Sequence, residues 1–138
     1  MTAKELLKGI IKLRKAIDYR KFKIEMLEAE AEKVTVPITG MPHSPSPDPS
    51  PMATAICEKI DLEREIKELT EKRKSLIAQI ELLDNEDYQK LLKKRYGQEE
   101  KWADISAIIG YSLNYTYRLH RRAIYELDCI LETHKSYL

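Results

Sequence analysis

The sequence is poor in glycine, phenylalanine and cysteine, and it lacks any long apolar run. Its 138 residues include four Gly, one Phe and two Cys, beside many Lys, Glu, Leu and Ile. This composition argues against a sheet-rich fold and predicts an all-α protein. Cys57 and Cys129 lie far apart and match neither a disulfide framework nor a zinc signature. No stretch approaches the roughly 18 apolar residues of a membrane span. We therefore expect a soluble, cytoplasmic protein that does not contact a membrane.

The residue groupings that carry catalysis are also missing from the sequence. No His/Cys/Asp/Glu cluster has the spacing of metal ligands, and there is neither a Gly-rich phosphate loop nor a Ser/His/Asp grouping. The many Asp and Glu residues are scattered over helix surfaces, where solvation explains them. The expectation is a protein that is not an enzyme and needs no cofactor or metal.

All six prolines lie in one segment, and this segment divides the chain. Residues 35–51 are predicted to form a Pro-rich loop, because proline removes helix hydrogen-bond donors and stiffens an extended chain. We expect one long heptad helix over residues 1–34 and a second heptad helix over residues 52–84. Residues 85–138 are predicted to form a C-terminal helical domain.

Both long segments carry seam residues at alternating steps of four and three, the pattern of a coiled coil. The first seam consists of Leu6, Ile10, Leu13, Ile17, Arg20, Ile24, Leu27, Ala31 and Val34. The second consists of Leu62, Ile66, Leu69, Arg73, Leu76, Ile80 and Leu83. Two such helices joined by one loop predict a long antiparallel helical hairpin, whose seam serves mainly as structural core. A two-helix hairpin buries little surface, so the C-terminal domain or a second copy of the chain is expected to complete it.

The register of this hairpin is open. One register places Ile10 opposite Leu83 and Ala31 opposite Leu62, and it also places Arg20 opposite Arg73. Two facing arginines are unfavourable unless both stems reach outward to solvent. A slip of seven residues, or pairing with a second copy, separates the two arginines.

Charge is sorted along the chain, although the net charge is only +1. From Tyr88 to Tyr125, eight Lys and Arg oppose three Asp and Glu, which gives 8 − 3 = +5. From Met52 to Asp87, six Lys and Arg oppose ten Asp and Glu, which gives 6 − 10 = −4. The positive block therefore falls on the C-terminal domain.

Within that domain, residues 101–127 have the pattern of a DNA-binding helix-turn-helix. A third helix over about residues 86–96 precedes it. Gly110 can adopt the left-handed conformation that ends one helix, and Ser112 can cap the next. The last helix is predicted to run to about Leu131, with an inner stripe of Thr116, Leu119, Ala123, Leu127 and Ile130.

The opposite side of the last helix is the candidate DNA-reading face. Arginine donates two parallel bonds to guanine, and residues near the start of a recognition helix reach base edges. Further basic side chains meet phosphates. The candidate DNA-binding residues are Ser112, Asn114, Tyr115, Tyr117, Arg118, Arg121 and Arg122, with the run Lys93, Lys94 and Arg95. The competing interpretation is an ordinary solvated basic face, which the surrounding helix-turn-helix pattern makes less favoured. Trp102 is predicted to anchor the core, and His120 to be partly buried or to face a phosphate.

The stretch LLKKRY…EEKWADISAIIGYSLNYTYRLHRRAIYEL resembles region 4 of bacterial sigma factors, and still more closely phage regulators of the ArpU/RinA type. The resemblance implies that Glu99 and Glu100 precede the first helix of the motif and that its second helix faces DNA. Ser106 stands where the family usually has Ala, and Thr116 where it has Val or Ile. The sigma segments that bind the promoter −10 element have no counterpart here, so an activator or sigma-like accessory is implied.

The sequence thus predicts a sequence-specific regulator of transcription that binds double-stranded DNA and controls phage or prophage genes. Its helical hairpin is expected to form a homodimer or to contact RNA polymerase. Two alternatives stand beside this prediction. One is a DNA-packaging adaptor of the small-terminase kind, and the other is a protein-interaction scaffold that does not bind DNA.

Overall fold

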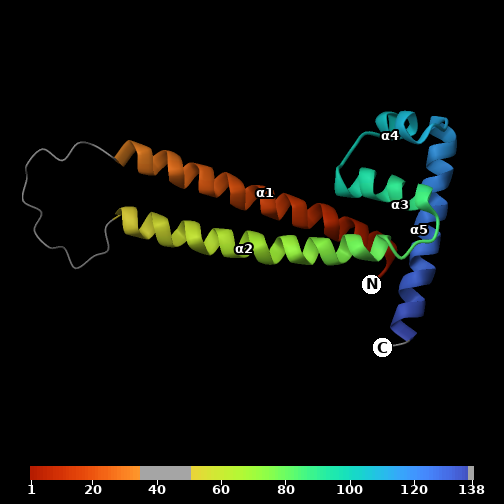
Figure 1. The fold of residues 1–138 in the computed structure, drawn as a ribbon, viewed down its shortest axis with the longest axis horizontal. Helices are drawn as coiled ribbons and strands as arrows, with labels where there is room; N and C mark the ends of the chain where they lie inside the picture. Colours follow the sequence, from red (N-terminus) through yellow and green to blue (C-terminus); the bar gives the residue numbers. More distant parts are fainter. Residues whose placement is uncertain (35–50, 137–138) are drawn as a thin grey trace, which may run out of the picture. The chain divides into compact units, whose positions relative to one another are not determined.

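The computed structural model describes residues 1–34 and 51–136, and within these ranges every regular element is helical (Figure 1). The predicted Pro-rich loop, apart from Pro51, lies outside the described residues. The helices are α1 (Ala3–Val34), α2 (Pro51–Ile80), α3 (Glu86–Leu92), α4 (Trp102–Ile109) and α5 (Leu113–Ser136). A π-helical segment, η1 (Lys93–Gly97), follows α3 directly. The all-α prediction is confirmed.

Several predicted boundaries differ from these elements. Pro51, predicted as the last residue of the loop, is the first residue of α2, where proline is tolerated because its missing N–H would have no helical partner. The helix expected over 86–96 is regular only to Leu92, and the chain then widens into η1. The last helix continues to Ser136, five residues beyond the predicted end. The second long helix ends at Ile80 rather than near residue 84. From Glu81 to Leu83 each backbone N–H donates to the carbonyl three residues earlier, as in a 3₁₀ turn.

The chain divides into two compact units. We call residues 1–14 and 71–138 the packed unit, and residues 15–70 the helix pair. In the helix pair, α1 and α2 lie side by side and run in opposite directions (Figure 1). The Arg20 Nε atom lies 2.7 Å from Glu65 Oε2, and the Lys59 Nζ atom lies 2.9 Å from Glu28 Oε1.

These ion pairs establish the register. Arg20 faces Glu65 rather than Arg73. The observed register therefore differs by about one heptad from the register in which the two arginines face each other. Ala31 accordingly lies near Ala55 instead of Leu62. The packed unit has the same offset, because a Cβ built on Gly9 would lie 3.3 Å from Leu76 Cδ1. The shift gives each seam arginine an oxygen partner: Arg20 binds a carboxylate, and Arg73 donates to the Gly97 carbonyl.

The packed unit holds the hydrophobic core. Buried side chains converge on it from the first turns of α1, the end of α2, α3, α4 and α5. They are Ala3, Leu6, Leu7, Ile10, Ile80, Leu83, Tyr88, Leu91, Leu92, Ile105, Leu119, Ala123, Leu127 and Leu131. On α5, the core position predicted for Ile130 belongs to Leu131, and Ile130 is only partly buried. Residues three and four positions further along a helix both lie near the same face. Here Leu131, four residues after Leu127, is the one that is buried.

Polar contacts tie the ends of these helices together. The Asn85 Oδ1 atom accepts from the backbone N–H groups of Asp87 and Tyr88, at 2.9 and 3.4 Å, and so caps α3. The backbone N–H of Ala3 donates to Asp128 Oδ1 at 2.6 Å, so a carboxylate on α5 neutralises the positive end of α1. Helices α1 and α5 are thereby joined across nearly the whole length of the sequence.

Candidate nucleic-acid interface

The turn between α4 and α5 depends on two residues, Gly110 and Ser112. Gly110 has φ 86°, a left-handed conformation that costs an L-residue with a Cβ about 1 kcal/mol or more. Its N–H donates to the Ser106 carbonyl at 3.0 Å and ends α4. The Ser112 Oγ atom then accepts from the backbone N–H of Tyr115 at 3.2 Å, which satisfies a free donor in the first turn of α5. The chain therefore changes direction within the three residues that separate α4 from α5 (Figure 1).

One side of α5 anchors the helix to the packed unit. Thr116, Leu119, Ala123 and Leu127 are buried at steps of three and four. Thr116 is fully buried despite its hydroxyl, because its Oγ1 donates to the Ser112 carbonyl at 2.8 Å. This internal bond explains how a threonine occupies a position where an aliphatic residue is the expected anchor.

The other side of α5 is exposed and positively charged. Arg118, Arg121 and Arg122 are all exposed, and none forms an ion pair or hydrogen bond within the part of the chain that the structure describes. From Leu113 to Tyr125 the helix contains these three arginines and no Asp or Glu. Asn114 is also exposed, in the first turn of the helix. The face offers three guanidinium groups, each with five donors. The first acidic residue of α5 is Glu126, one turn after Arg122, and it forms no ion pair with these arginines in the described chain.

Two tyrosines flank this face, and both rest on aromatic neighbours. Tyr115 packs against Tyr111, with ring centroids 4.9 Å apart, and the Tyr111 hydroxyl donates to Asp87 Oδ2 at 3.2 Å. Tyr117 packs edge-on against Trp102 at 5.3 Å. These contacts restrict the two rings, which remain partly exposed to solvent.

The basic run Lys93–Arg95, which lies in η1 directly after α3, is engaged with other protein groups. The Lys93 Nζ atom lies 2.7 Å from Glu81 Oε1, and Lys94 Nζ lies 3.8 Å from Glu100 Oε2. Arg95 donates to the Glu100 carbonyl at 2.9 Å, and its guanidinium lies 4.7 Å from the centre of the Trp102 ring. Of the predicted DNA-binding residues, the arginines of α5 are free of such partners and the Lys93–Arg95 run is not.

His120 lies behind the exposed face, half-buried against Tyr96 and Trp102. Its Nε2 atom is 2.7 Å from the Tyr96 hydroxyl oxygen. Burial, and to a lesser extent the nearby Arg95 guanidinium, lowers the pKa of His120 below its ordinary value. Burial also raises the pKa of Tyr96, so both rings are neutral near pH 7. This pair therefore supports α5 as an uncharged contact and adds no positive charge to the face.

Arg14 and Arg73 hold the chain just before α4. Arg73 belongs to the second seam, and Arg14 lies beside Leu13 of the first seam. Arg14 Nη1 donates to the Gly97 carbonyl at 3.1 Å, and Arg73 donates to the same oxygen. Carbonyls at a helix end carry partial negative charge, which two guanidinium groups stabilise. No local sequence pattern predicts this contact, because its three residues are far apart in the chain.

A protein-family model matches residues 52–128, which include the turn and the exposed face of α5. Its description is "Protein of unknown function (DUF1492)". The chain belongs to this family. No curated protein and no solved structure matches the DUF1492 chain. Among the described residues of this DUF1492 protein, no group of three or more His, Cys, Asp or Glu side chains is placed to hold a metal ion, and none of the helices is apolar over a length that could cross a membrane.

Proposed function

We propose that this DUF1492 protein binds specific DNA sequences and regulates transcription, with α5 as the helix that enters the major groove. The observation that carries the proposal is the unpartnered arginine face of α5 directly after a tight turn. A recognition helix needs a buried stripe to hold it and an exposed face to read bases, and α5 has both.

The residues of this face divide by their distance from the start of α5. Asn114 and Tyr115 lie in its first turn, where side chains of a recognition helix reach base edges. Arg118 follows one turn later on the same side as Tyr115, and it is the candidate for a bidentate contact with guanine. Arg121 and Arg122 lie further along and are suited to phosphates, which position the protein without reading sequence.

The resemblance of residues 88–127 to sigma region 4, and to phage regulators of the ArpU/RinA type, supports a role at promoters of phage or prophage genes. The residues that resemble those regulators include the capped turn before α5 and the arginines of α5. Transcription control is a binding function, so the proposal requires neither a catalytic group nor a cofactor.

The first experiment is selection of bound sites from random double-stranded DNA, followed by fluorescence anisotropy on the selected site. Arg118→Ala is expected to weaken specific binding about tenfold or more and to relax preference at one base position. Arg121→Ala is expected to weaken binding to all sequences and to reduce the salt dependence by about one unit in the log–log slope.

Arg64→Ala is the matched control, because it removes one exposed arginine from the helix pair and changes net charge equally. It is expected to leave affinity unchanged. Failure of selection to enrich any sequence, together with the absence of salt-sensitive affinity, would support a protein-interaction scaffold and overturn the proposal. A ring of eight or more subunits in light scattering would instead favour a packaging adaptor.

A further inference from the structure

The outer side of α1 in the helix pair carries a stripe of large, half-exposed apolar residues. The Nζ atom of Lys23 lies 4.7 Å from the centre of one of their rings, that of Tyr19. Tyr19, Phe22 and Met26 are 56%, 55% and 49% exposed. Their spacing of three and four residues places them on one helix face. Exposed Lys15 precedes them by four residues, and exposed Glu30 follows by four. We call Lys15, Tyr19, Phe22, Met26 and Glu30 the α1 stripe.

The charges along this part of α1 are sorted by sign. Residues 15–23 carry Lys15, Arg20, Lys21 and Lys23 against Asp18, a balance of 4 − 1 = +3. Residues 25–32 carry Glu25, Glu28, Glu30 and Glu32 and no Lys or Arg, a balance of −4. Arg20 and Glu28 already form ion pairs within the helix pair, and without them the first segment is still basic and the second still acidic. A helix that is basic at one end and acidic at the other complements a second copy of itself when the two run antiparallel.

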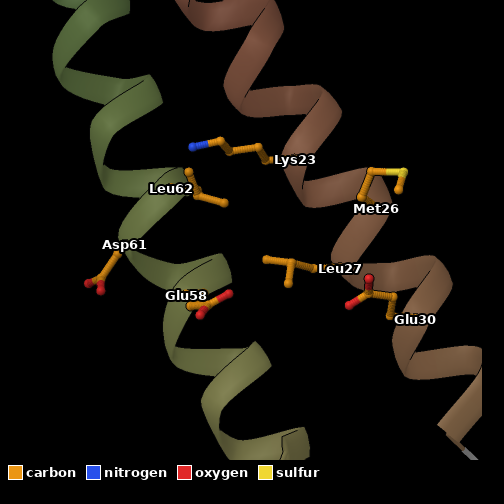
Figure 2. A pocket seen from close by; sticks show the side chains of 7 residues that line it. All are labelled: Lys23, Met26, Leu27, Glu30, Glu58, Asp61 and Leu62. Carbon is orange, nitrogen blue, oxygen red and sulfur yellow. The ribbon is translucent and has the colours of Figure 1, made fainter.

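An acidic groove borders the α1 stripe. It has a volume of about 470 Å³ and shares Met26 and Glu30 with the stripe. Figure 2 shows Leu27 of α1 and Leu62 of α2 pointing toward one another between the helices, with Glu58 and Asp61 on the α2 side. Its lining carries three carboxylates against the single ammonium of Lys23, so the groove favours an apolar and basic occupant. The Lys15 end of the stripe has that character.

We propose that two copies of this protein associate through their α1 stripes, antiparallel and with a two-fold axis beside Phe22. In this arrangement Lys15 of each copy meets Glu30 of the second copy, and Tyr19 packs against Met26. The Lys15 side chain also approaches the carboxylate of Glu58, which points toward α1 (Figure 2). Every contact occurs twice, as a two-fold interface requires.

The size of the stripe sets the strength of the association. From Lys15 to Glu30 the stripe is about 22 Å long, at 1.5 Å per residue. Each copy contributes three large apolar side chains and the edges of the groove. The area buried between the copies is therefore small compared with that of most specific dimers. A dimer that dissociates in the micromolar range is expected, whether or not the protein binds DNA.

Sedimentation equilibrium of the full chain over a range of concentrations tests the proposal. The wild type is expected to shift from monomer to dimer, and Phe22→Ala to raise the dissociation constant about tenfold or more. Lys15→Glu is expected to raise it about tenfold, because it places like charges together at two symmetric sites. The double variant Lys15→Glu/Glu30→Lys is expected to restore it to within about threefold.

Matched controls lie on other faces of the same helix pair. Ile60→Ala removes a side chain that is 51% exposed on α2, and Lys21→Glu reverses a charge off the α1 stripe. Both are expected to leave the dimer intact, with helix content checked by circular dichroism. A monomer at all concentrations overturns the proposal, and so does a dimer that Ile60→Ala weakens more than Phe22→Ala.

Cross-linking tests the direction of pairing separately. In a Cys57→Ser/Cys129→Ser background, oxidation of Phe22→Cys is expected to give a linked dimer, because position 22 lies beside the axis. Glu30→Cys alone is expected to remain unlinked, since the two copies of position 30 are about 22 Å apart along the helices. A linked dimer from Glu30→Cys alone would show parallel pairing and overturn the antiparallel arrangement.

Discussion

The packed unit and the helix pair contain similar helices but bury very different numbers of side chains. Among the described residues, every side chain that is essentially inaccessible to solvent belongs to the packed unit. Among the described residues of the helix pair, only Ile17 is buried, and it is 7% exposed. Both units draw on the same two heptad seams, so the seam itself does not explain the difference.

The difference lies in what covers each helix. In the packed unit, α3, α4 and α5 supply further apolar faces, so a leucine of α1 or α2 is enclosed on several sides. In the helix pair each helix has one neighbour, and its remaining surface faces solvent. Two helices alone bury too little area to offset the conformational entropy of folding, so the pair depends on continuation into the packed unit or on a partner.

The largest expected effect compares one leucine from each unit. Leu127→Ala is expected to lower the free energy of unfolding by about 3 kcal/mol, because it opens a cavity in an enclosed core. Leu62→Ala is expected to cost less than about 1.5 kcal/mol, since its site is partly open to water. Urea unfolding of each variant, followed by circular dichroism and by Trp102 fluorescence, measures both. Equal losses in the two variants would contradict the difference between the units.

A smaller effect separates backbone strain from side-chain packing within the packed unit. Gly110→Ala is expected to destabilise the protein by about 1 kcal/mol, because its φ of 86° is unfavourable for alanine although the added methyl group meets no atom within 4 Å. Gly97→Ala also meets no atom within 4 Å, and its φ lies outside the left-handed range. It is expected to be neutral or to stabilise by a few tenths of a kcal/mol.

Thermal unfolding followed by Trp102 fluorescence distinguishes the two glycine variants, because this single tryptophan lies in the packed unit. If Gly97→Ala destabilises as much as Gly110→Ala, the conformation of the turn does not limit the stability of this unit.

The smallest expected effect is a pH dependence confined to the packed unit. Burial, then Arg95, holds the folded-state pKa of His120 below its ordinary value near 6.5. The unfolded chain therefore binds more protons at that position, and stability that is complete above the ordinary pKa of histidine is lost as the pH falls below it. His120→Gln is expected to flatten this part of the profile while keeping a partner for Tyr96. An unchanged slope of melting temperature between pH 7.5 and 5.5 would exclude His120 as its source.

The sequence predicted the fold well where one residue type determines one local conformation. The four-three spacing located both long helices, and Gly110 with Ser112 located the turn, because a left-handed residue and a cap leave clear local signals. The inner stripe of α5 followed from helical periodicity alone, apart from Ile130.

What the sequence could not predict depends on which distant groups meet. A heptad pattern is unchanged by a slip of seven residues, so the register was undetermined until Arg20 was found beside Glu65. Arg73 has the position of a seam residue, yet it binds a carbonyl from another segment. The basic run Lys93–Arg95 was grouped with the α5 arginines by charge, and its ion pairs with Glu81 and Glu100 became visible only in three dimensions. Which of these residues contact DNA stays a prediction.

The bond between the Ala3 amide and Asp128 has a consequence for how the protein is made. The two residues of this bond are 125 positions apart, and the core that holds Leu6, Leu7 and Ile10 also contains side chains of α5. These three residues therefore cannot be fully buried until α5 has been synthesised. At about 5 to 20 residues per second this delay lasts on the order of 6 to 25 seconds. During that interval these apolar side chains lack their partners on α5, so we expect the nascent chain to be more prone to aggregate than the folded protein.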